Sequence, residues 1–101
     1  MKITIEELQE YLFDHYKNGG IDQSLFMKLV EEIGEVAEVL NKKAGRKSVG
    51  QEDLQTQLGN ELADVVHYTI AIAALNGIDM NDIILSKDKD ASIKYNHRIN
   101  L

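Results

Sequence analysis

Two short acidic motifs contain the residues of this sequence whose types and spacing could do chemistry. The first is an ExxE motif formed by Glu32 and Glu35, and the second is an ExxD motif formed by Glu61 and Asp64. Acids three residues apart share one face of a helix. If two such helices pack antiparallel, the carboxylates converge, and raised pKa values or a bound cation must relieve their repulsion. Oxygen ligands without cysteine favour a hard ion, Mg²⁺ where the substrate carries phosphates, with Mn²⁺ as a substitute.

Hydrophobic residues at helical spacing predict the two helices that position these acids. The first of the two should run from about Asp22–Ser24 to about Lys43, and the second from about Gln51 to Leu75. Their apolar stripes are formed by Phe26, Leu29, Val30, Ile33, Val36, Ala37 and Leu40, and by Leu54, Leu58, Leu62, Val65, Thr69 and Ile72. The acids lie at the margins of these stripes, so they can face each other across an antiparallel pair.

Capping signals predict where these and other helices begin. Thr4 and Glu7 form a capping box for a first helix that should end at the Asn-Gly-Gly sequence of residues 18–20. A second capping box, over residues 48–51, precedes the helix that carries the ExxD motif. Asp79 can cap a last helix.

The last helix should reach Ser86 or continue to Tyr95. No segment alternates apolar and polar residues with β-branched enrichment, so no strand is expected. The sequence therefore predicts an all-α fold, a bundle of four to five helices in a single domain over residues 1–101.

Composition limits the classes of protein and favours an oligomer. A chain of 101 residues without cysteine has a small core and no disulfides to support it. Residues 65–75 are apolar almost all round, which predicts additional cover from a second subunit. The net charge of −6 opposes general nucleic-acid binding. The sequence shows neither a signal peptide nor an apolar stretch of membrane-spanning length, so we expect a cytoplasmic protein.

Two other interpretations of the acidic motifs compete with a metal site. Glutamate is a strong helix former, and ExxE is common on solvated helix faces, as in a non-catalytic helical dimerisation or regulatory module. A di-iron carboxylate bundle would need Glu-x-x-His on two helices, and the chain contains no such motif. His67 falls away from the Glu61 and Asp64 stripe, which indicates a packing or interface residue rather than a ligand.

The two motifs and their flanks resemble those of the MazG-like nucleotide pyrophosphohydrolases, an all-α superfamily. The shared segments are KLVEEIGEVAE and NELADVVHYTIAIAALNGID, and the resemblance extends over roughly Ser24 to Asp82. It implies hydrolysis of a nucleoside triphosphate to the monophosphate and pyrophosphate, with Mg²⁺ between the four acids and the phosphates. It also implies a homo-dimer or homo-tetramer, and a role in removing non-standard or surplus nucleotides.

The resemblance and the charges also suggest further site residues. Glu35 is expected to position or deprotonate the attacking water. Lys28, Lys87 and Lys94 are candidates for phosphate contacts, while Tyr68, on the acid stripe, either contacts the nucleotide or packs in the core or an interface. The chain departs from the family pattern between Lys87 and Lys94, where Ala91 replaces an expected Asn.

Overall fold

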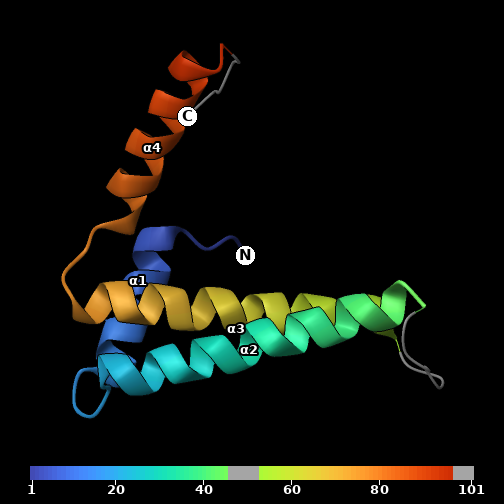
Figure 1. Ribbon diagram of the computed structural model, residues 1–101. Helices are drawn as coiled ribbons and strands as arrows, with labels where there is room; N and C mark the ends of the chain where they lie inside the picture. Colours follow the sequence, from blue (N-terminus) through green and yellow to red (C-terminus); the bar gives the residue numbers. More distant parts are fainter. Residues whose placement is uncertain (46–52, 97–101) are drawn as a thin grey trace.

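The protein is an all-α chain, as the sequence predicts (Figure 1). The computed structural model describes residues 1–45 and 53–96, and within these ranges it contains helices and no strand. The helices are α1 (Ile5–Tyr16), α2 (Asp22–Lys43), α3 (Leu54–Leu75) and α4 (Met80–Lys94). None of these helices combines the length and the hydropathy of a membrane-spanning segment within the described ranges.

Local capping signals set three of the helix starts. The Thr4 hydroxyl accepts from the Glu7 amide at 3.0 Å, and the Glu7 carboxylate accepts from the Thr4 amide at 3.1 Å, so the predicted capping box is confirmed. Asp79 caps α4 by accepting from the Asp82 amide at 3.1 Å. The helix that it starts runs without interruption to Lys94, which is the longer of the two predicted courses.

The start of α3 differs from the prediction. The predicted start was Gln51, but the helix begins at Leu54, because the Asp53 carboxylate accepts from the Thr56 amide and hydroxyl at 3.1 and 2.6 Å. The predicted capping box of residues 48–51 lies outside the described residues.

The helices form a long antiparallel hairpin with one helix across its end and one standing apart. In Figure 1, α2 and α3 lie side by side, α1 crosses the end of α3 near its C-terminus, and α4 points away from the hairpin. The core lies where α1 crosses, and consists of Leu12, Leu25, Ile70 and Ala71. The acidic motifs therefore lie on the hairpin, outside this core.

The apolar second half of α3 receives its additional cover from α1. Ile70, Ala71, Ala73 and Ala74 are buried, and α1 packs on this part of the helix. The expectation that a second subunit supplies this cover was therefore wrong for these residues. A crossing helix of the same chain was close enough to do so.

The apolar stripe predicted for α2 is largely exposed. Phe26, Val30, Ile33 and Leu40 retain 45–53% of their surface, because α3 packs on the neighbouring row that contains Leu25 and Val39, which are each 5% exposed. Both rows are apolar, and α3 can cover only one of them. Phe26 is consequently not a core residue, contrary to the prediction.

The exposed row of α2 continues onto α3. Leu62 and Val66 are 46% and 50% exposed, and each lies one position after a residue of α3 that faces α2. Phe26 and Leu40 likewise lie one position after residues of α2 that face α3. One position along a helix turns the side chain by about 100° around the helix axis. In antiparallel helices this rotation takes both rows to the same side of the hairpin. We call this side the apolar face, made up of Phe26, Val30, Ile33, Leu40, Leu62 and Val66.

Candidate metal centre

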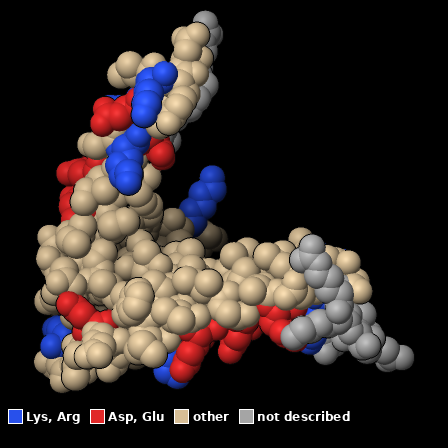
Figure 2. Space-filling model, in the orientation of Figure 1, with Lys and Arg blue, Asp and Glu red and all other residues tan. Residues whose placement is uncertain are grey.

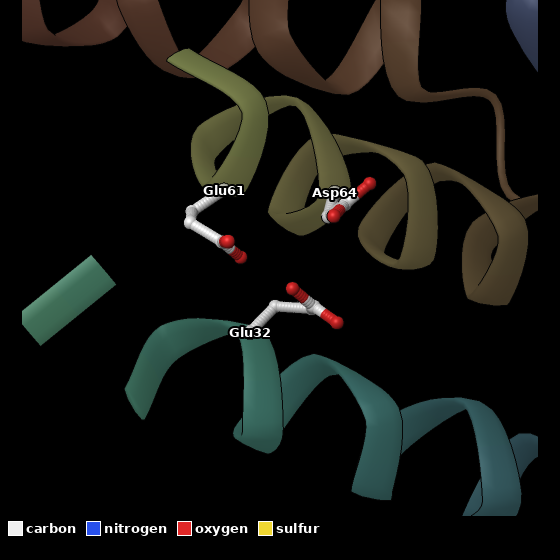
Figure 3. A group of neighbouring side chains, drawn as sticks. All are labelled: Glu32, Glu61 and Asp64. Carbon is white, nitrogen blue, oxygen red and sulfur yellow. The ribbon is translucent and has the colours of Figure 1, made fainter. Parts of the chain in front are cut away.

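The two acidic motifs meet across the hairpin. Glu32 of α2 and Glu61 and Asp64 of α3 each offer a carboxylate oxygen, and these oxygens lie within 4.8 Å of one another (Figure 3). Two oxygens bound to one Mg²⁺ lie about 3–4 Å apart, since each Mg–O bond is about 2.1 Å long. Small side-chain rotations would therefore bring the group to the dimensions of a magnesium site.

Two oxygens at the centre of this group are buried without a partner. Oε2 of Glu32 and Oε2 of Glu61 are shielded from solvent and, when both carboxylates are ionised, have no hydrogen-bond donor within the described structure. An unsatisfied buried carboxylate oxygen is costly, and such atoms in a native fold usually indicate an ion or water that binds there. A divalent cation between the two side chains would satisfy both oxygens, so the donor set fits a hard metal ion.

Because the carboxylates lie close together, the pKa values of Glu61 and Glu32 are raised. The pKa of Glu61 is raised from 4.5 to about 7 by hydrogen bonds with Glu35 and Glu32, by burial and by the negative charges of those two residues. For Glu32, the hydrogen bond with Glu61 lowers the pKa, but burial and the charges of Glu35 and Asp64 outweigh it, so the pKa is raised overall. Without a cation, a proton on Glu61 supplies the missing donor as the pH falls below about 7, and a cation would displace this proton.

Glu35 borders the group rather than belonging to its centre. Its side chain is exposed and contacts Glu61 from α2, one helical turn after Glu32. The structure therefore brings all four predicted acids together, with Glu32, Glu61 and Asp64 closest and Glu35 on the solvent side. Figure 2 shows acidic side chains gathered along the lower edge of the hairpin, next to a wide uncharged surface.

The predicted substrate contacts are divided between the hairpin and α4. Lys28 is exposed on α2, with its ammonium 3.4 Å from Glu31 Oε2. Tyr68 is half-buried and packs against the core. Lys87 and Lys94 lie on α4, which points away from the hairpin in Figure 1. Within one chain, the structure does not bring these two lysines to the acids.

A polar pair between α1 and α3 was not predicted from the sequence. The Tyr16 hydroxyl of α1 lies 2.7 Å from His67 Nε2 of α3, and the two rings meet edge to face. Burial and the nearby Tyr68 and Tyr11 raise the pKa of Tyr16, so its hydroxyl stays protonated. The His67 ring also packs edge to face on Tyr68, which links α1 to the acid-bearing stripe of α3. A half-buried histidine on an apolar helix was the only signal, because its partner is 51 positions away.

Comparisons with known proteins agree with the fold and the motifs. The family described as MazG nucleotide pyrophosphohydrolase domain matches residues 22–99, which include both acidic motifs. The crystal structure of iMazG from Vibrio DAT 722 matches 94% of this chain and 100% of its own, with 26% identity and a TM-score of 0.67. No curated protein matches the chain.

Proposed function

Since the chain belongs to the MazG nucleotide pyrophosphohydrolase family, we propose that it hydrolyses a nucleoside triphosphate to the monophosphate and pyrophosphate, with Mg²⁺ as cofactor. The observation that carries this proposal is the pair of buried, unpartnered oxygens of Glu32 and Glu61, which lie beside Asp64. A merely solvated helix face would leave such oxygens in contact with water. A non-catalytic helical module would have no need for this arrangement.

In this proposal Glu32, Glu61 and Asp64 hold the metal, and Glu35 completes the set from the solvent side. Bound Mg²⁺ would neutralise the phosphate charge and stabilise the negative charge that develops on the leaving group. The hairpin holds its carboxylates on two packed helices, so the ligands are positioned before the substrate arrives. The raised pKa of Glu61 means that metal binding near neutral pH releases a proton.

Glu35 is the proposed base. Its exposed carboxylate beside Glu61 can accept a proton from a water molecule that approaches the triphosphate from solvent. The water oxygen forms a bond to the α-phosphorus, as the family relationship suggests, and the bond between that phosphorus and the bridging oxygen breaks. The proton passes to Glu35, and pyrophosphate leaves with the electron pair.

We further propose that a second copy of the chain covers the apolar face. Phe26, Val30, Ile33 and Leu40 are separated by four, three and seven residues, which is the spacing of a helix–helix seam. Such a row, exposed to water on a small chain, favours association with a similar row. Glu35 lies one position before a residue of α2 that faces α3, and Asp64 lies one position before a residue of α3 that faces α2. Both acids therefore lie on the side of the hairpin opposite the apolar face. A dimer or tetramer built on this face would leave the acids accessible.

A pyrophosphate-release assay over ribo- and deoxyribonucleoside triphosphates, with and without Mg²⁺, tests the proposed activity. We expect Mg²⁺-dependent release of pyrophosphate from at least one nucleotide, and its loss in Glu61→Gln. Glu10→Gln makes the same change at an exposed glutamate of α1, outside the acidic group, and should retain activity. Mg²⁺ binding by calorimetry without release from any nucleotide would favour the non-catalytic module.

A further inference from the structure

The turn over residues 76–79 connects α3 to α4. After α3 ends at Leu75, Gly77 has a φ of +65°, and the Ile78 amide donates to the Ala73 carbonyl at 3.0 Å. Helix α4 then leaves the hairpin (Figure 1), packs chiefly against α1, and contains no buried residue. Within one chain, packing along the length of α4 therefore does not fix its direction, so the contacts at its base are the ones that can.

The side chain of Gln9 joins this turn to α1. Gln9 Nε2 donates to the Ile78 carbonyl oxygen at 2.5 Å, and the Met80 amide donates to Gln9 Oε1 at 3.3 Å. The Met80 amide belongs to the first turn of α4, whose N–H groups have no partner within the helix. Asp79 satisfies the amide of Asp82 from within the turn, and Gln9 satisfies that of Met80 from another helix.

We propose that Gln9 is a positioning residue that fixes the direction of α4. Its primary amide is both a donor and an acceptor, so it can pair with a backbone carbonyl and a backbone amide two residues apart. A carboxylate in its place would lose the donor. It would also add a negative charge to an open hollow of about 340 Å³ that Glu6, Glu10 and Asp79 already line.

The direction of α4 matters for the site through its lysines. Lys87 and Lys94 lie on this helix, and the distance of their ammonium groups from a bound triphosphate, in the same or a neighbouring copy, depends on the angle at its base. This consequence rests on the proposed function, whereas the hydrogen-bonded clamp at Gln9 does not.

Electron spin distance measurements test the clamp directly. The chain has no cysteine, so Asn60→Cys on α3 and Asp90→Cys on α4 give two labelled sites, and dilution with unlabelled protein isolates the distance within one chain. We expect one narrow distance in the parent protein, and loss of that narrow peak in Gln9→Leu and, to a greater extent, in Gln9→Glu. Gln23→Leu, at an exposed glutamine of α2, should keep the parent distance. Unshifted, narrow distances in both Gln9 variants would overturn the proposal.

A second measurement avoids any change to Gln9. Hydrogen exchange of the Met80 amide in the parent chain should be slowed, because this amide donates to Gln9, whereas the first amides of an unclamped helix exchange freely. Free exchange at Met80 would overturn the proposal even if the Gln9 variants failed to fold. Neither measurement depends on turnover, so a chain without pyrophosphohydrolase activity would refute the proposed function and leave this test intact.

Discussion

The α2–α3 hairpin and α4 obtain their positions in different ways. In the hairpin, Leu25 and Val39 are each 5% exposed, and two packed helices hold the acids opposite one another. Helix α4 has no buried residue and depends on hydrogen bonds at its base. The proposed metal ligands, whose positions must be the most accurate, thus lie on two helices that pack against each other. The lysines proposed for phosphate contacts lie on α4, whose direction we attribute to the contacts at its base.

Substitutions in the acidic group should have the largest effect on activity, and they test the role proposed for the α2–α3 hairpin. Glu35→Gln should lower kcat by about 100- to 10,000-fold, the range expected for loss of a general base, while Mg²⁺ still binds, with lower affinity, through Glu32, Glu61 and Asp64. Asp64→Asn should remove both turnover and Mg²⁺ binding, since it changes a proposed ligand. Steady-state kinetics and calorimetry on the same preparations separate the two roles. Pyrophosphate release at the parent rate by either variant would contradict its assignment.

Substitutions of the α4 lysines should have a smaller effect and a different kinetic signature. Lys87→Ala and Lys94→Ala should each raise KM for the triphosphate by about 10-fold or more, because each removes a charge-assisted contact to phosphate. The effect on kcat should be small, since the proposed metal site lies on the hairpin. Lys89→Ala is the matched control on the same helix. An equal rise in KM in all three variants would indicate a general effect of charge, and no rise in any would exclude α4 from substrate binding.

Sequence reasoning succeeded where the determinants are local. The capping box of Thr4 and Glu7 and the cap at Asp79 each depend on residues three positions apart, and both are present in the structure. The acids could also be paired from the sequence, because spacing on each helix and an antiparallel hairpin suffice to bring them together. Helix type, helix order and the meeting of the two motifs were therefore predictable.

Features that depend on tertiary contacts could not be predicted from spacing. On α2, the rows that begin with Leu25 and Phe26 are both apolar, and helical periodicity cannot say which one α3 will cover. The contact of Tyr16 with His67, and that of Gln9 with the turn after α3, join residues 51 and about 70 positions apart. Such pairs follow from the crossing of α1, which the sequence does not specify.

Breaking the apolar face should affect assembly more than it affects the fold of one chain. Ile33→Glu places a charge where a second copy is proposed to pack, and burial of an unpaired charge is unfavourable, so the oligomer should dissociate. Helix content should be retained, because Ile33 is 52% exposed within one chain. Sedimentation and circular dichroism measure the two effects. Ile21→Glu, at a residue that is 62% exposed and outside the apolar face, is the control. An unchanged molar mass in Ile33→Glu would exclude this face as the interface.

The smallest predicted effect is a pH dependence of stability that the acidic group imposes on the metal-free protein. Because the pKa of Glu61 is raised from 4.5 to about 7 in the fold, the folded chain binds this proton more tightly than the unfolded chain does. The resulting stabilisation is fully present below about pH 4.5 and is lost as the pH rises to about 7. In EDTA, the Tm of the parent protein should therefore fall over this range relative to that of Glu61→Gln, whose side chain does not titrate.

Added Mg²⁺ should restore the stability that is lost as the pH rises, which would show that the loss comes from the acids of the hairpin. The cation binds the ionised carboxylates, so it should raise the Tm of the parent protein more at pH 8 than at pH 5, and should have little effect on Glu61→Gln. Substitution of Lys87 on α4 should leave the pH dependence unchanged, because that residue lies outside the acidic group. A Tm difference between the parent and Glu61→Gln that stays constant from pH 5 to pH 8 would show that the carboxylates do not share a proton in the fold.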